Sequence, residues 1–229
     1  MAPVTGIAYI ILKPGIQLTG SSTEAKAWAE ALSTIQAQEG YQRLHWGTTL
    51  EDEDLLMLLI DWDDVEAHHK FMNAPVYTPF KQTLGKIMTG VHLFHVTPSP
   101  FPPKVLGEAP CIEFAAFYSP GPTFLSSMEK FVGILAENWK EGKIEGFYGG
   151  SYGESVEGGL VKHEEVLEGK AAGDVEGLGE GKVVVGFLGW ESKEAHLKFR
   201  ETELFKENIG LLRTDNRGAE LFHIKLTAA

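Results

Sequence analysis

Several histidines recur at a fixed spacing in this chain, and histidine is well suited to move protons near neutral pH. The stretch WDDVEAHHKF (62–71) returns as WESKEAHLKF (190–199), and the same offset of 128 residues carries LFHV (93–96) onto LFHI (221–224). Two separated matches at one offset indicate an internal duplication. A neutral imidazole with a pKa of ~6.5 can abstract a phenolic or enolic proton, so base catalysis is the chemistry that these residues suggest.

The two copies differ in their polar aromatic groups, and the difference favours the first half as the working one. Groups of this kind occur in the first half without a clear copy in the second: His69, His45, Trp46 and His92. The second half has Leu197, Tyr148 or a neighbour, and Glu220 in their places. We therefore expect the catalytic residues to be His68, His69 and His45. A structural histidine that packs the start of a helix in both copies is the competing interpretation.

Aromatic side chains would form the wall of a pocket for a flat apolar ligand. The residues expected to bind the substrate are Tyr9, Trp46, Trp62, Phe71 and His92. The candidates in the second half are Glu113, Tyr148 and His196. Glu113 lies among apolar neighbours, so it either serves as a base in a second pocket or faces a seam of the fold with a partner.

The spacing of the histidines does not favour a metal site. Alternation along a strand places His92 and His95 on opposite faces, and the adjacent helical residues His68 and His69 diverge by roughly 100°. The glycine-rich stretch GGSYG (149–153) does not lead from a strand into a helix, so it is not a nucleotide-binding fingerprint. We therefore expect no metal and no cofactor.

Composition describes a globular protein and restricts its partners. Hydrophobic residues make up 43% of the chain and charged residues 23%. The net charge of −12 opposes approach to nucleic acid or to an anionic membrane surface. The one cysteine, Cys111, allows no intramolecular disulfide and fits a reducing compartment, so a cytoplasmic protein is expected. The apolar run 7–12 is too short for a membrane helix.

Hydrophobic periodicity and turn residues predict the order β-α-β-β-α-β for the first half. The expected strands are 6–12, 41–49, 55–62 and 91–96. The expected helices are 23–38, capped by Ser22, and one capped by Asp64, which Pro75 interrupts before a further piece at 77–88. The second half repeats the pattern with strands 111–118, 143–152, 182–190 and 219–226 and with helices 123–139 and 192–212.

This order makes a four-stranded antiparallel sheet with both helices on one face, which is the ferredoxin-like plan. Strand 55–60 (LLMLLI) is apolar on both faces, so its outer face must be covered, and the second copy is the expected cover. The predicted fold class is α+β, with two ferredoxin-like βαββαβ units that form an intramolecular pseudo-dimeric α/β barrel.

The expected domains are a first unit at 1–97, a proline-rich linker at 98–110 and a second unit at 111–229. The linker holds too many prolines for regular structure and should be extended. An acidic, glycine-rich insertion at about 157–181 lengthens one hairpin of the second unit. It is either a solvated extension or a mobile lid.

A βαββαβ unit whose third strand ends in Trp and leads into a helix of the pattern W-x-x-x-E-A-H-x-K-F resembles the dimeric α/β-barrel superfamily. The nearest branch is the antibiotic biosynthesis monooxygenase-like domains, here as a tandem fusion that covers nearly the whole chain. The resemblance implies a substrate pocket inside each unit, between the sheet and its helices. Members include cofactor-free oxygenases of polyketide anthrones, haem-degrading oxygenases, polyketide cyclases and a hydroxynitrile lyase, so the fold does not choose among them.

We expect a cofactor-independent enzyme of secondary metabolism that acts on an apolar aromatic or polyketide-like small molecule. The leading reaction is monooxygenation, in which a histidine deprotonates the substrate and the carbanion reacts with O2. The alternatives are a polyketide cyclase or lyase-type enzyme on the same fold, and a non-catalytic binding or stress-associated protein. The expected assembly is a monomer with an internal pseudo-dimer, or a homodimer of it, without nucleic-acid or membrane partners.

Overall fold

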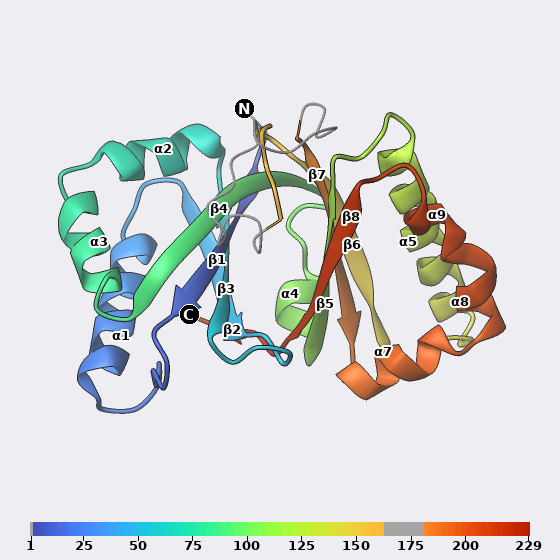
Figure 1. Ribbon diagram of the computed structural model, residues 1–229, viewed down its shortest axis with the longest axis horizontal. Coiled ribbons are helices and arrows are strands. Elements are labelled where there is room, and N and C mark those ends of the chain that lie inside the picture. The colour runs from blue at the N-terminus through green and yellow to red at the C-terminus, as the bar shows by residue number, and fades with distance from the viewer. Residues whose placement is uncertain (1, 163–180) are drawn as a thin grey trace. The chain divides into compact units, whose positions relative to one another are not determined.

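The computed structural model describes residues 2–162 and 181–229, and it divides into two compact units (Figure 1). The first unit comprises Met1–His95 and Thr227–Ala229, and the second comprises Val96–Leu226. Most of the insertion expected at 157–181 lies outside the described residues, so its role as an extension or a lid stays a prediction.

The first unit is a sheet with three helices on one face. Its strands are β1 (Val4–Leu12), β2 (Tyr41–Thr48), β3 (Leu55–Trp62) and the first part of β4 (Met88–Ser99). Its helices are α1 (Thr23–Gln36), α2 (Val65–Asn73) and α3 (Tyr77–Leu84). The strand order is β4-β1-β3-β2, and the C-terminal β9 (Thr227–Ala228) pairs antiparallel with β2. The expected βαββαβ order is confirmed.

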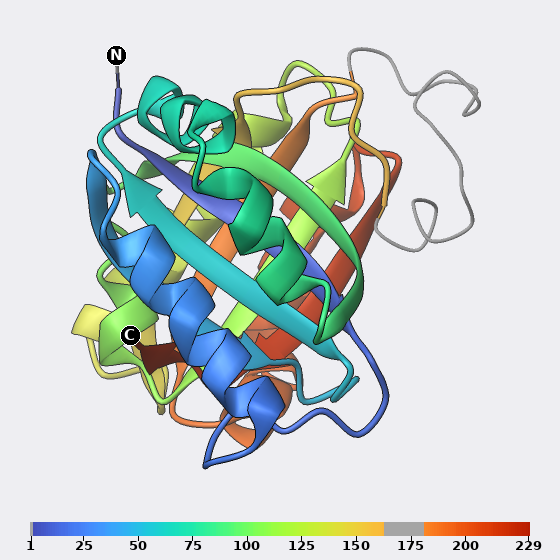
Figure 2. The ribbon, with the colours of Figure 1, turned by 90° about the vertical axis from the view of Figure 1, so that its left-hand side faces the viewer.

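Local side-chain chemistry fixes where the first-unit helices begin. The Ser22 hydroxyl accepts a hydrogen bond from the Ala25 N–H at 3.0 Å, and the Asp64 carboxylate accepts one from the Ala67 N–H at 2.9 Å. Figure 2 shows α1 and α3 lying across the strands of this unit. Their apolar faces cover a sheet whose third strand, Leu55–Trp62, is buried along its whole length.

The second unit repeats the plan. Its strands are β5 (Cys111–Tyr118), β6 (Phe147–Ser155), β7 (Val183–Trp190) and β8 (Gly218–Ile224), in the order β8-β5-β7-β6. Its helices are α5 (Phe124–Lys140), α7 (Lys193–Arg200), α8 (Glu203–Asn208) and α9 (Gly210–Arg213). The prediction of an α+β chain made of two ferredoxin-like units is therefore confirmed.

Two second-half predictions differ from the structure in detail. The helix expected at 192–212 is broken into three, because Thr202 caps a new helix by accepting the Phe205 N–H at 3.2 Å and Gly210 begins another. The strand expected at 143–152 begins later, at Phe147, because Gly146 adopts a φ of 68° in the preceding turn.

The proline-rich segment was expected to lack regular structure, and this is wrong at two places. β4 continues to Ser99 and pairs with β6, with Val96 opposite Ser155. A short helix, α4 (Val105–Glu108), follows the prolines, and the Leu106 N–H donates to the Pro103 carbonyl at 3.1 Å. Prolines permit both elements because each lies at a strand end or before a first helical turn, where its missing N–H is not needed.

Candidate active site

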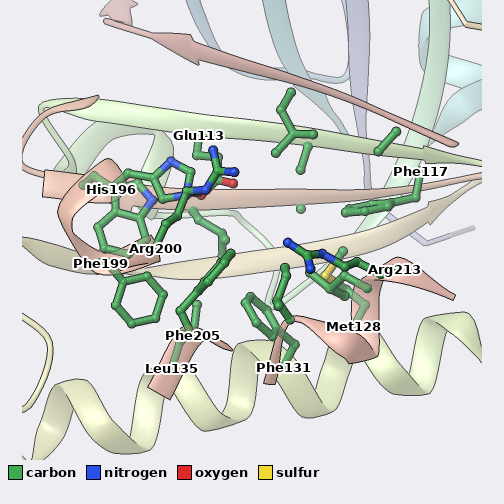
Figure 3. Close-up of a pocket in the computed structure, with 18 of the residues that line it drawn as sticks. Glu113, Phe117, Met128, Phe131, Leu135, His196, Phe199, Arg200, Phe205 and Arg213 are labelled. Atoms are coloured by element: carbon green, nitrogen blue, oxygen red, sulfur yellow. Dashed lines mark hydrogen bonds and ion pairs between the residues drawn. The ribbon is translucent and has the colours of Figure 1, made fainter. Parts of the chain in front are cut away.

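A cavity of about 280 Å³ lies inside the second unit, between the sheet and its helices (Figure 3). Strands β5, β7 and β8 form one wall, and α5 and α7 to α9 form the other. Most lining side chains are apolar, such as Phe117, Phe131 and Phe205. The polar exceptions are Glu113, Trp190, His196, Arg200, Arg213 and Asn216. The position between sheet and helices is the one that the family resemblance implies.

A buried chain of polar groups closes one end of the cavity. The Trp190 indole N–H donates to Glu113 Oε2 at 3.0 Å, and His196 Nε2 lies 3.3 Å from the same oxygen. His196 Nδ1 in turn lies 2.8 Å from His223 Nε2 on β8. The imidazole of His196 also stacks on the Trp190 ring, with centroids 5.1 Å apart. Strand β5 supplies the carboxyl group, β7 the indole and α7 the first imidazole, so three elements fix one site.

Burial sets the protonation states of Glu113 and His196. It raises the pKa of Glu113 from 4.5 to about 7, although the Trp190 hydrogen bond and the Arg200 charge act in the opposite direction. Burial, together with His223 and Arg200, lowers the pKa of His196 to about 3. His196 is therefore a neutral imidazole at pH 7, and its 3.3 Å approach to Glu113 is not an ion pair.

The first unit contains the same histidine pair without the carboxyl group. His68 Nδ1 lies 2.7 Å from His95 Nε2, and His68 stacks on Trp62 with centroids 4.8 Å apart. Strand register places Gly6 where the second unit has Glu113: Gly6 is opposite Ile60, two residues before Trp62, and Glu113 is opposite Leu188, two residues before Trp190. Within the described chain, the buried Trp62 indole nitrogen has no hydrogen-bond partner. A carboxylate acceptor distinguishes the second site from the first.

Large side chains pack against one another inside the first unit. Trp28, Leu58 and Phe71 belong to one buried cluster, and Trp28 meets Trp46 edge-on with centroids 5.4 Å apart. At the strand position of Leu58 the second unit has Gly186, because Leu58 pairs with Ala8 and Gly186 pairs with Ala115 in the equivalent strands. Gly186 lines the cavity. Loss of one large side chain from the strand floor therefore leaves space in the second unit.

The three catalytic candidates of the first unit lie apart. His68 is buried in its contact with His95, whereas the His69 side chain is 48% exposed and lies 3.9 Å from the Glu66 carboxylate. His45 is buried on the sheet face opposite Trp46, and burial lowers its pKa. The hypothesis that they form one first-unit site gains no support from this arrangement, because the described cavity with convergent polar groups lies in the second unit.

The substrate-binding candidates of the first unit divide between two faces of its sheet. Trp46, Trp62 and Phe71 pack on the helix side. Tyr9 and His92 stack on each other, with centroids 5.7 Å apart, on the opposite side. The reason is strand alternation: Ala8 and Ile10 face the helices, so Tyr9 between them faces away. The five candidates thus lie on two sides of the sheet, and their role in substrate binding stays a prediction.

Two of the three second-unit candidates lie at the cavity. Glu113 and His196 both line the cavity, whereas Tyr148 is 38% exposed and does not. The second strand of each unit has a bulge at the same place, and the registers match Tyr152, opposite Gly186, with Trp46, opposite Leu58. The sequence comparison set Tyr148 or a neighbour against Trp46 because it lacked this register: the two strands are related by an offset of 106 residues and not by 128.

Sequence reasoning did not assign His223, Arg200 or Arg213 to the site. A signal for each exists in the 128-residue offset, which pairs His95 with His223, Met72 with Arg200, and Gly85 with Arg213. His223 repeats His95, whereas the two arginines replace uncharged residues of the first half. Interpreting such replacements requires knowing which helix positions face the cavity, and only the tertiary structure shows that.

Two further observations concern the described residues. They contain no group of three or more histidine, cysteine, aspartate or glutamate side chains placed to hold a metal ion. Over the same residues, no helix is long and apolar enough to cross a membrane.

Comparison with known proteins places the fold. Residues 21–83 match the family model described as antibiotic biosynthesis monooxygenase. A search of curated proteins found no match. An anthrone oxidase-like protein has a similar structure, with a TM-score of 0.63 at 15% identity over 99% of this chain and 93% of that chain. A candidate monooxygenase from Lactobacillus acidophilus NCFM aligns with a TM-score of 0.58 at 12% identity over 100% and 96%.

A candidate monooxygenase from Fusobacterium nucleatum is also similar, with a TM-score of 0.60 at 12% identity over 99% of this chain and 94% of that chain. At these identities the likeness establishes the shared fold, and it extends over both units. The family match itself falls within the first unit, and the internal repeat extends its plan to the second. The family model thus matches part of the first unit, and the whole chain shares its fold with these solved structures.

Proposed function

We propose that this protein is a monooxygenase-like enzyme that oxidises an aromatic or polyketide-like molecule in the cavity of the second unit, with Glu113 as the catalytic base. One observation carries the proposal: a buried carboxyl group with a pKa of about 7 lines an apolar cavity. Bases tuned near the working pH combine an available unprotonated form with enough basicity to accept a proton.

The cavity suits a flat apolar substrate of modest size. Its volume of about 280 Å³ is near the lower end of the ~300–1,000 Å³ that is usual for small-molecule sites. Aromatic walls from Phe117, Phe131 and Phe205 would stack against or abut rings. An open cavity with convergent polar groups favours an enzyme over a protein whose interior serves only for stability.

The proposed reaction converts an activated methylene into a carbonyl group. Glu113 removes one proton from the methylene carbon, which becomes a carbanion stabilised as a phenolate or enolate. The carbanion donates electrons to O2, a C–O bond forms, and the resulting peroxide anion takes back the proton from Glu113. Loss of the second C–H proton and cleavage of the O–O bond then give the carbonyl group and water. One O2 is consumed per methylene, so atoms and electrons balance.

His196 and Trp190 are positioning residues in this scheme. Trp190 donates to Glu113 Oε2 and His196 lies against the same oxygen, so they hold the carboxylate and leave its other oxygen to meet the substrate. His223 fixes the imidazole of His196 from behind at 2.8 Å. This arrangement resembles the general pattern in which a base is oriented by a further hydrogen-bonded group.

The test is oxygen uptake by purified, chelator-treated protein with anthrone-type substrates, after subtraction of the rate without protein. Glu113→Gln should lower the rate by ~10²–10⁴-fold, the usual contribution of a general base. Glu220→Gln is the matched control, because Glu220 is buried in the same unit, bonded to Tyr118 at 2.7 Å, and does not line the cavity. It should retain activity.

Three outcomes would overturn the proposal. Full activity in Glu113→Gln with loss of activity in His68→Ala or His69→Ala would move the reaction to the first unit. Turnover without oxygen consumption, with a ring-closed or cleaved product, would favour a cyclase or lyase. Binding of many aromatic compounds with no turnover would favour a non-catalytic binding protein.

A further inference from the structure

Two arginines give the otherwise apolar cavity a cationic side. Arg200 ends α7 and Arg213 ends α9, and both guanidinium groups point into the cavity (Figure 3). The Arg200 guanidinium lies over the Phe205 ring, 5.9 Å from its centroid. Stacking of this kind restrains a guanidinium while leaving its N–H edge available.

Both arginines belong to the unit that contains the cavity. The 128-residue offset pairs Arg200 with Met72 and Arg213 with Gly85, so the first unit has neither charge. The offset is reliable here, because it also matches the buried Phe71 with Phe199 and Leu84 with Leu212. Two cations thus accompany Glu113 and Gly186 as features of the second unit alone.

The charge balance at the cavity is opposite to that of the chain. Among the described residues that line it, the charged groups are Glu113 and the two arginines. Arg200 lies close enough to act on the pKa values of both Glu113 and His196. A chain of net charge −12 therefore presents a positive site at this one cavity. A neutral hydrocarbon gains nothing from that charge, whereas an anion does.

We propose that Arg200 and Arg213 bind a carboxylate group of the substrate, so that the second unit selects aromatic carboxylic acids over neutral aromatic compounds. A guanidinium presents paired N–H donors that match the two oxygens of a carboxylate. The aromatic body of the ligand would occupy the apolar part of the cavity, with its reacting carbon toward Glu113. This inference names the substrate class for the function proposed above and rests on the same cavity.

The test compares a carboxylate with its neutral amide. 2-Naphthoate and 2-naphthamide have nearly the same shape, and calorimetric titration of each at pH 8 measures binding without turnover. Wild-type protein should bind the naphthoate at least about tenfold more tightly, which is the effect of one charge-assisted hydrogen bond at a partly exposed site. Arg200→Met and Arg213→Met should each lose most of that preference and leave naphthamide affinity unchanged.

Lys206→Met provides the matched control. Lys206 lies on α8, is exposed, pairs with Glu203 at 3.0 Å and does not line the cavity. It removes one positive charge from the same part of the unit, so a general electrostatic effect would appear in this variant as well. Circular dichroism of each variant verifies folding before binding is compared.

Failure of this inference is distinguishable from failure of the proposed function. Equal affinity for naphthoate and naphthamide in wild type, or an equal loss in Lys206→Met, would overturn the anion site even if oxygen uptake with neutral anthrones depended on Glu113. Conversely, arginine-dependent naphthoate binding without oxygen uptake from any acidic anthrone would leave the anion site standing and remove the oxygenase.

Discussion

At the scale of single residues, the two copies of the histidine pair differ by one carboxyl group. Glu113 occupies the strand position that Gly6 has in the first unit. Its carboxyl group gives the Trp190 N–H an acceptor that the Trp62 N–H lacks. A buried acid is costly to ionise, because the hydrogen bond from the indole only partly replaces water. The site therefore holds a carboxyl group that changes protonation near neutral pH.

Because ionising the buried Glu113 is costly, the free energy of unfolding should depend on pH. The substitution Glu113→Gln should remove this dependence. The folded-state pKa of about 7 exceeds the ordinary value of 4.5, so between these values the folded chain keeps a proton that the unfolded chain has lost. Stability contributed by the neutral acid is present below pH 4.5 and is lost as pH rises through 7. Relative to wild type, the variant should therefore gain about 3 kcal/mol of unfolding free energy between pH 4.5 and pH 8.

Urea unfolding of both proteins at the two pH values measures this difference. The lowered pKa of His196 adds a slope of opposite sign below pH 6.5, but it is common to both proteins and cancels in the comparison. A difference between wild type and variant that did not change with pH would show that Glu113 titrates normally.

At the scale of elements, one strand position that lines the cavity differs in size between the two units. β3 reads LLMLLIDW and β7 reads VVVGFLGW, so the position that is Leu58 in the first strand is Gly186 in the second. Both strands are buried throughout, and both pair with their neighbours in the same register. The two strands thus have the same backbone pairing, but the volume of the side chains above the sheet differs.

Gly186→Leu should close the cavity by restoring the residue of the first unit. A Cβ at this position would lie in ordinary contact, 3.5 Å from the Met128 Cε, and the rest of the side chain would extend into the open space. We expect loss of naphthoate binding and of oxygen uptake, with a stability cost within the ~1–3 kcal/mol of overpacking. Calorimetric titration and thermal unfolding measure the two effects.

Gly133→Leu is the control for that substitution. Gly133 lies on α5 with nothing within 4 Å of an added Cβ, so the same change there should leave binding intact. Undiminished ligand binding in Gly186→Leu would show that the ligand site is elsewhere.

At the scale of the whole molecule, the two copies share a histidine pair and differ in its surroundings. The first unit has the His68–His95 contact at 2.7 Å, nearly equal to the 2.8 Å of its counterpart. The pair is therefore a shared structural feature, and we expect the proposed function to depend on the carboxyl group and the cavity beside the second pair. A single ligand per chain is the expected stoichiometry.

Intrinsic fluorescence should locate that ligand in one of the two units. Trp190 lines the cavity, whereas Trp62 occupies the same place in the packed first unit. Naphthoate should quench part of the emission of wild-type protein and of Trp62→Phe, and it should quench Trp190→Phe much less. Calorimetry on each variant separates loss of quenching from loss of binding, and quenching that disappears in Trp62→Phe alone would assign the ligand to the first unit.

The sequence by itself determined the duplication, the order of elements and the caps at Ser22 and Asp64, because these depend on repeats and local spacing. It also identified Glu113 and His196 as candidates, since a charged residue in an apolar strand and a recurring histidine are visible without a fold. Strand alternation correctly separated His92 from His95.

Only the tertiary structure decided which unit contains the cavity and which groups meet there. Glu113 contacts Trp190 and His196, which lie 77 and more residues away, and only the strand pairing shows that Tyr152 is the counterpart of Trp46. The physical reason is that a cavity is a deficit of packed volume. It depends on the sum of side chains from several elements, and no single stretch of sequence contains that sum.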